Sequence, residues 1–178
     1  MSNVLIGIIG VILFIGLALA GALFLGPRFQ ESTNNSKASA AVQAVSQISS
    51  AANMNNVQGG TATQAGPAAA VTALATNGYL KSVPSNPVTG GGAPLLVADN
   101  AGAVSGDAAY VIMSIPTASV AICEAIARQS GQPVTSAGVV TDVATGGATL
   151  PVRPSGCAKI TGTGTTAMPA GLYAYAAI

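Results

Sequence analysis

Histidine and tryptophan are absent from this 178-residue sequence, and only 6% of its residues are charged. An average globular domain has about 25% charged residues, so this chain has roughly a quarter of the charge of a conventional soluble surface. Without histidine, the most common general base and metal ligand is missing. The formal net charge of +1 provides no basic surface of the kind that binds nucleic acid or an anionic membrane. These deficits favour a structural protein.

Groups that carry chemistry are correspondingly scarce. The acidic residues are too few and too scattered to form a catalytic pair; they are Glu31, Asp99, Asp107, Glu124 and Asp142. The glycine cluster at 90–92 is not followed by Lys-Ser/Thr, so a phosphate-binding loop is not expected. The four tyrosines are expected to fill the core rather than to stack on a ligand. We predict no enzymatic activity, no cofactor, no metal site and no sequence-specific binding of nucleic acid.

The chain does have one long hydrophobic run, since 4–25 contains no charged residue. As a helix, this run spans roughly 33 Å, enough to cross a hydrocarbon core of about 30 Å. The first charge is Arg28, directly after Gly26-Pro27. The run therefore predicts a membrane helix.

Three interpretations of this helix remain open. A secretory signal peptide would have a basic start and a shorter apolar segment, whereas this run is long and follows the uncharged Met-Ser-Asn. A plain membrane anchor is the second interpretation. The third is a helix that leaves the membrane for a protein assembly, which is favoured by the glycines, because small residues allow close helix contacts and weaken a helix locally. We expect unwinding at four positions, Gly16, Gly21, Gly26 and Pro27.

The first residue has two interpretations as well. If Met1 is an initiator, the membrane segment lacks the basic flank that normally sets orientation. If Met1 instead follows a removed leader, that leader supplied the positive charges. We favour the second interpretation.

Three segments follow from the pattern of the chain. Residues 1–26 form the hydrophobic helix, 27–56 its amphipathic continuation, and 57–178 a globular head. Apolar positions from Ala38 to Ala52 recur in steps of three and four residues, which indicates a narrow helical face suited to packing on a sheet. We therefore expect one helix of about fifty residues, interrupted near Gly26-Pro27.

Turn residues and short apolar runs divide the head into elements. Pro67 begins a short helix through Thr76, which Asn77-Gly78 closes. Residues 78–92 are expected to form a loop, and a second helix is expected from Pro116-Thr117 to Gly131. The expected strands are 93–97, 108–115, 135–143 and 171–178. Helices followed by strands with long loops predict an α+β fold with a small, mainly antiparallel sheet.

The two cysteines, Cys123 and Cys157, both lie in the head. A disulfide is favoured if the head is exported to an oxidising compartment, and it would stabilise the head by roughly 3–4 kcal/mol. A pair of buried free thiols is the alternative. A zinc site is less favoured, because two cysteines without histidine cannot complete the ligand shell.

The layout resembles the type IV pilins, and more specifically their type IVb branch. The resemblance lies in the glycine-interrupted apolar N-terminus, its amphipathic continuation, and the segments GYLKSVPSNPVTGG, IPTASVAICEAIA, PSGCAKI and GLYAYAAI. It implies the pilin fold, with the first of these segments joining the long helix to the sheet and the two cysteine-bearing segments bridged. It also implies that a prepilin peptidase removes a short leader, so that Met1 becomes the mature, often methylated N-terminus.

The resemblance further implies a homopolymer built by the pilus assembly machinery. The subunit waits in the inner membrane and then joins an extracellular pilus that serves attachment, motility, DNA transfer or phage reception. The hydrophobic helices would pack in the filament core through Leu5, Ile8, Ile12, Phe14, Leu17 and Phe24.

One position departs from the family pattern. Pilins usually have Glu at the fifth mature position, where it pairs with a neighbouring N-terminal amine, but this chain has Leu5 and no acid before Glu31. We therefore expect assembly to depend on apolar packing and to need no Glu at position 5. The departure leaves open a minor pilin or pseudopilin of a secretion system, or an exported binding domain on a membrane anchor that does not polymerise.

Overall fold

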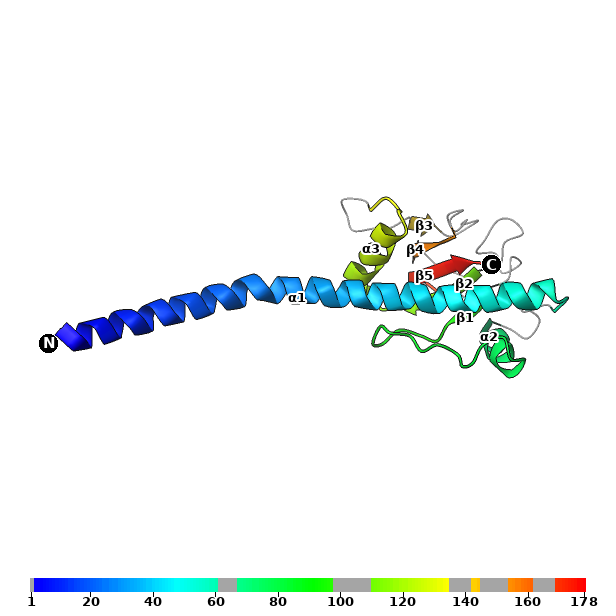
Figure 1. Ribbon diagram of the computed structural model, residues 1–178. Coiled ribbons are helices and arrows are strands. Elements are labelled where there is room, and N and C mark those ends of the chain that lie inside the picture. The colour runs from blue at the N-terminus through cyan, green and yellow to red at the C-terminus, as the bar shows by residue number, and fades with distance from the viewer. Residues whose placement is uncertain (1, 61–66, 98–109, 135–141, 145–153, 162–168) are drawn as a thin grey trace. The chain divides into compact units, whose positions relative to one another are not determined.

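The computed structural model describes residues 2–60, 67–97, 110–134, 142–144, 154–161 and 169–178 (Figure 1). By its internal contacts the chain divides into two compact units, Met1–Asn34 and Asn35–Ile178. This boundary lies downstream of Pro27, where the sequence predicts the change from the apolar to the amphipathic half. Helix α1 (Ser2–Val57) begins in the first unit and ends in the second.

Helix α1 has 56 residues and includes Pro27 in its interior. The break that we expected at Gly16, Gly21, Gly26 and Pro27 is wrong for the single chain, because α1 is helical through all four residues. Glycine costs about 1 kcal/mol in a helix, and proline removes one helical hydrogen bond, but the apolar residues on both sides keep forming theirs. That the stretch unwinds in an assembly stays a prediction.

The second unit contains a five-stranded sheet with the order β1-β2-β5-β4-β3. The strands are β1 (Leu95–Val97), β2 (Tyr110–Ile115), β3 (Asp142–Ala144), β4 (Ser155–Thr161) and β5 (Gly171–Ala177). Neighbouring strands are antiparallel, except that β3 runs parallel to β4. The predicted α+β class with a long N-terminal helix and a mainly antiparallel sheet is confirmed.

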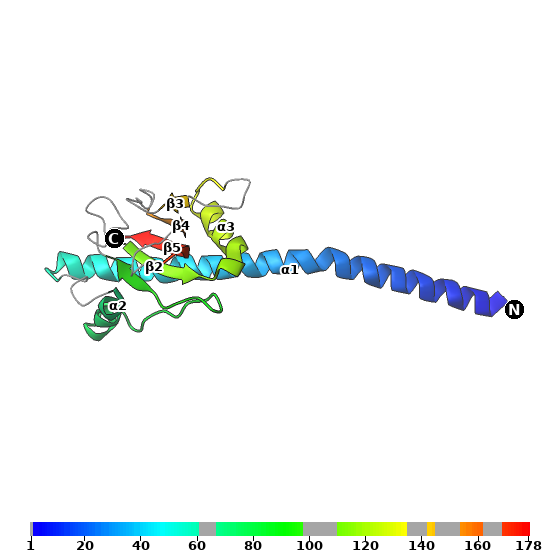
Figure 2. The same ribbon diagram turned by 180° about the vertical axis from the view of Figure 1, so that it is seen from behind.

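Helices cover one face of this sheet. The part of α1 that belongs to the second unit packs there with α2 (Pro67–Thr76) and α3 (Val120–Gln129), and all three contribute to one apolar core with the sheet. Helix α2 contacts β1, whereas α3 contacts β4 and β5, so the two short helices lie toward opposite edges of the sheet (Figures 1 and 2). This arrangement leaves α1 between them.

The other face of the sheet has a second, smaller apolar cluster. Its buried members are Val97, Tyr110, Ile112, Ala158, Ile160, Tyr173 and Tyr175. The rings of Tyr110 and Tyr175 meet edge to face, with their centroids 6.1 Å apart. Three of the four tyrosines therefore fill this core, as the sequence predicted.

Several predicted elements have the expected bounds. Helix α2 begins at Pro67 and ends at Thr76, and Gly78 follows it with a φ of +83°, which a residue with a side chain rarely adopts. Residues 78–92 form a loop. In contrast, α3 begins at Val120 and not at the expected Pro116-Thr117, because a 3₁₀ turn at Thr117–Ser119 precedes it.

The strands agree less closely. The expected strands at 93–97, 108–115 and 171–178 correspond to β1, β2 and β5. Of the expected strand at 135–143, residues 135–141 lie outside the described part of the chain, and 142–144 form β3. Strand β4 (Ser155–Thr161) was not predicted.

Candidate assembly surface

The apolar N-terminal segment of α1 is the first candidate for a functional surface. Thirteen large hydrophobic side chains there are 50–76% exposed: Val4, Leu5, Ile6, Ile8, Ile9, Val11, Ile12, Leu13, Phe14, Ile15, Leu17, Leu19 and Leu23. By length and composition, α1 is able to cross a membrane, and its most apolar stretch of 18 residues has a mean hydropathy of 2.8 with no part buried. Because a helix that is apolar all round must be buried somewhere, this segment needs a surrounding other than water.

The residues proposed for filament-core packing belong to this surface. Leu5, Ile8, Ile12, Phe14 and Leu17 are 56–74% exposed in the single chain, so their side chains are available to lipid or to a second molecule. The side chain of Phe24 and the whole of Met1 lie outside the described residues.

Charge begins only after this surface ends. Arg28 and Glu31 lie 3.9 Å apart on successive turns of α1, with both side chains more than half exposed. An exposed ion pair of this kind contributes little to stability. The pair therefore marks the polar end of the apolar surface rather than holding it in place.

Within the second unit, α1 has a different, narrower apolar face. Small side chains dominate it, and its fully buried members are Ala38, Ala41, Val45, Ile48 and Ala52. Ala44, Ala51 and the half-buried Val42 belong to the same apolar core, and the polar Ser49 is buried as well. Small side chains let the helix backbone lie close to the sheet, as the periodicity predicted.

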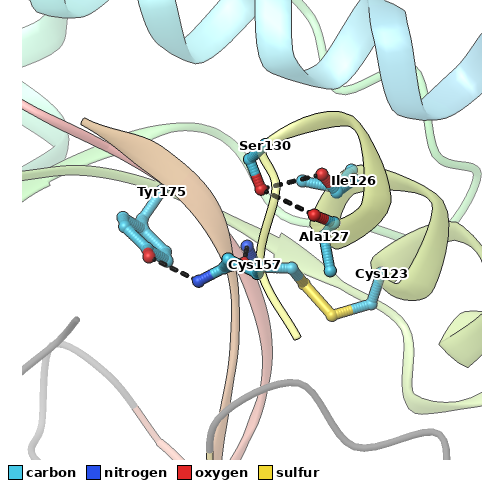
Figure 3. Close-up of a disulfide and its surroundings, with 7 residues drawn as sticks. Cys123, Ile126, Ala127, Ser130, Cys157 and Tyr175 are labelled. Atoms are coloured by element: carbon cyan, nitrogen blue, oxygen red, sulfur yellow. Dashed lines mark hydrogen bonds between the residues drawn. A yellow bond between two sulfur atoms is a disulfide. The ribbon is translucent and has the colours of Figure 1, made fainter. Parts of the chain in front are cut away.

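The disulfide expected between Cys123 and Cys157 is present and joins α3 to β4 (Figure 3). Their Cα atoms lie 5.5 Å apart, and both residues are at most 1% exposed. At the end of α3, the hydroxyl of Ser130 lies 3.0 and 3.1 Å from the carbonyl oxygens of Ile126 and Ala127, the bonds drawn in Figure 3. The bridge therefore fixes α3 to the sheet.

A buried glutamine reinforces the same connection. Gln132 accepts a hydrogen bond from the Cys157 backbone N–H at 2.8 Å and donates one to the Tyr175 hydroxyl at 2.7 Å. A side chain at Gly156 would overlap that of Gln132, which explains glycine at that position of β4. The sequence carried no signal for this contact, because the three residues are far apart in the chain.

Asn86 ties the loop at 78–92 to the sheet. The amide nitrogen of Asn86 donates to the carbonyl oxygens of Gly92 and Ser114, both at 2.8 Å, and its oxygen accepts the Val88 N–H at 2.9 Å. Gly91 lies so close that an added Cβ would come within 2.6 Å of the Ser114 carbonyl oxygen. The prolines on either side predicted a loop but not this anchor.

Two adjoining hollows lie between α1 and this loop. They have volumes of about 530 and 430 Å³ and share Gln43 and Gln47 of α1. Lys81 lines the larger hollow, and the other residues that line the two hollows are uncharged. Neither hollow brings together groups that suit a defined chemical reaction.

The described acidic residues do not gather into a reactive site. Glu31 pairs with Arg28, and Glu124 lies 3.4 Å from Arg128 one turn along α3. In the part of the chain that the structure describes, no three metal-ligating side chains lie together. Asp99 and Asp107 lie outside that part.

One tyrosine has an altered acidity. Burial raises the pKa of the Tyr173 phenol above its usual value of 10.0, because the charged form would lose its hydration. Its hydroxyl donates a hydrogen bond to the Pro169 carbonyl oxygen at 2.8 Å. This environment suits a structural tyrosine of the second core.

Comparisons of the chain with protein-family models, with curated proteins and with solved structures find no match.

Proposed function

We propose that this chain is the structural subunit of a type IV pilus filament. In this proposal a prepilin peptidase releases Met1 as the mature N-terminus, and the chain waits in the inner membrane through the apolar part of α1. The pilus assembly machinery then transfers it to an extracellular homopolymer on the cell surface. The observation that carries the proposal is the apolar surface of α1, with 13 large hydrophobic side chains that are 50–76% exposed.

The size of this surface supports burial in two successive environments. Covering one large aliphatic or aromatic side chain is worth about 1.5–3 kcal/mol, so the 13 exposed side chains are worth on the order of 20 kcal/mol. That exceeds the total stability of a typical domain. When the chain leaves the membrane for water, another apolar surface must therefore take the place of the lipid. In the proposed filament, the α1 helices of other subunits provide that surface.

The head supports the proposal in a second way. Its disulfide is typical of proteins in an oxidising compartment, which fits an exported domain. The scarcity of charge also fits a head whose sides are largely covered by neighbouring subunits.

The decisive experiment is to shear filaments from cells that express the chain and to image them by electron microscopy. We expect ordered fibres that contain this polypeptide, and mass spectrometry of their subunits is expected to start at Met1, with or without a methyl group. Fibres are expected although the fifth residue is leucine. Chains that remain single and embedded in the membrane fraction would contradict the proposal.

A labelling experiment tests which surface the fibre buries. Both native cysteines are bonded to each other, so Ile12→Cys introduces a single free thiol on the apolar surface. Thr89→Cys places a matched thiol on the exposed loop of the head. In membrane-free fibres, a water-soluble maleimide is expected to label the Thr89→Cys subunit and spare the Ile12→Cys subunit, whereas both react after the fibre is dissolved in aqueous trifluoroethanol, in which no micelle covers the apolar helix. Equal labelling in the intact fibre would refute burial of α1.

A second function is favoured by the absence of any acid before Glu31. Without the acid that pairs with a neighbour's N-terminal amine in pilins, the chain would serve as a minor pilin or pseudopilin, or as an anchored exported domain that binds a ligand without polymerising. A minor subunit would be found at low copy number within fibres of another polypeptide. An anchored domain would stay with the membrane after shearing.

A further inference from the structure

In its middle, helix α1 passes from the first unit to the second. Residues 32–36 read Ser-Thr-Asn-Asn-Ser, and all five are poor helix formers. The same residue types are the preferred N-caps, because their side chains accept a hydrogen bond from a free backbone N–H at the start of a helix. A run of cap-forming residues inside a helix indicates a place where the helix is able to begin anew.

Hydrogen bonds connect the head to α1 at Asn35 and Ser39. The Gln129 side-chain nitrogen donates to the Asn35 carbonyl oxygen at 3.4 Å. The Ser39 hydroxyl lies 3.0 Å from the same carbonyl oxygen and 3.3 Å from the Gln129 side-chain oxygen. Among the α1 residues whose burial the structure describes, Ala38 is the first that is buried. The division between the two units falls directly before Asn35.

Gln129 is itself held in a fixed position. It is the last residue of α3, and the disulfide from Cys123 ties that helix to β4. Three residues later, Gln132 bonds the backbone of the same bridged cysteine, Cys157. The disulfide and the Gln132 hydrogen bond therefore hold the end of α3 against β4, and Gln129 is held in place with it.

Upstream of Asn35 the helix is weaker. Pro27 has no N–H to donate, so the turn that contains it lacks one hydrogen bond. Residues 28–33 are exposed, so burial does not stabilise their helical conformation. Unwinding between Pro27 and Asn35 therefore opens a weakly held part of α1 and leaves the head intact.

From these observations we infer that Asn35 is a second, latent N-cap of α1, at which the head-bound helix begins when residues 28–34 unwind. In that state the Asn35 side chain accepts the N–H of Lys37 or Ala38, and its carbonyl still accepts the N–H of Ser39. Gln129 holds that carbonyl in both states and stops the unwinding there. The inference concerns single chains and does not depend on the proposed filament.

Hydrogen exchange on the full-length chain in detergent micelles tests this device. After correction for intrinsic rates, amides of 28–36 are expected to exchange at least roughly ten-fold faster than those of 41–48, with the change falling between Ser36 and Ala41. Uniform protection from 28 to 48 would overturn the inference.

Two variants separate the cap from helix propensity. Valine has about the helix propensity of asparagine and threonine but cannot cap. Asn35→Val is therefore expected to disfavour the open state and to slow exchange at 28–34 about five-fold, the usual effect of a lost cap. Thr33→Val, the matched control, is expected to change these rates less than two-fold. Equal effects of the two substitutions would refute the latent cap.

The role of Gln129 has its own test. Gln129→Ala is expected to speed exchange at Ser39 and Val42 several-fold, because the unwinding is no longer stopped at Asn35. Arg128→Ala, the neighbouring control, is expected to leave these amides unchanged. Unaltered exchange in β2 and β5 verifies that the head is folded in both variants. If Gln129→Ala leaves the boundary at Asn35, the stop is not provided by Gln129.

Discussion

Removal of the Cys123–Cys157 bridge is expected to cost the head much of its stability. The bonded residues are 34 positions apart, and the chain-entropy model assigns a closed loop of this length about 4 kcal/mol. A typical domain is stable by only about 5–15 kcal/mol in total. Both cysteines are buried, so substitution by alanine also removes packed sulfur atoms. The double variant Cys123→Ala/Cys157→Ala is therefore expected to be folded but marginal.

The aromatic residues offer a selective assay for this change. All four tyrosines lie beyond residue 78, and all three phenylalanines lie before residue 30. Near-ultraviolet tyrosine circular dichroism therefore reports the head and not the apolar helix. For a unit of this size, a loss of about 4 kcal/mol lowers Tm by roughly 10–15 °C.

A matched variant controls for damage to α3. Ser130→Ala removes the hydroxyl at the end of that helix but keeps the bridge, and it is expected to lower Tm by only a few degrees. Should the double-alanine variant melt within about 3 °C of the wild type, the stabilisation argued for the bridge would be wrong.

Three further predictions concern the loop anchor and the second core. Asn86→Ala removes three hydrogen bonds and is expected to cost about 2–3 kcal/mol in denaturant unfolding. Gly91→Ala forces a Cβ against Asn86 and Ser114 and is expected to cost about 1–3 kcal/mol; an unchanged midpoint would contradict the close contact. Burial raises the pKa of Tyr173, so the stability that its neutral phenol contributes is fully present below pH 10.0 and is lost as the pH rises through the raised value. Tyr173→Phe should therefore lose less stability than the wild type in alkaline unfolding titrations.

Local signals predicted those parts of the fold whose causes are local. Helix α2 has Pro67 at its first position and Gly78 after its end, and both effects operate within a few residues. The buried face of α1 follows from the spacing of its alanines and aliphatic residues. The disulfide followed from there being two cysteines in a segment expected to be exported.

The missed features depend on distant partners. Strand β4 has the sequence Ser-Gly-Cys-Ala-Lys-Ile-Thr, which lacks a clear alternation, and it is a strand because β5 and β3 pair with its two sides. The anchors Asn86 and Gln132 are polar residues in loops, and only the folded chain shows which backbone groups they bind. The break expected near Pro27 was wrong for the single chain because helix breakers lower stability without forbidding the helix.

The two halves of α1 explain the unusual composition. A helix that is apolar on every side excludes charge from the first 27 residues, whereas the half in the second unit needs small side chains to lie close to a sheet. Neither half can replace the other, since alanines would provide too little apolar area in a membrane and leucines would overpack the head. Residues 32–36 lie between these two requirements and satisfy neither, because they are polar, not buried and poor in helix propensity. That is why a change in the surroundings of the apolar half is expected to unwind residues 28–34 up to Asn35, and to leave the head folded.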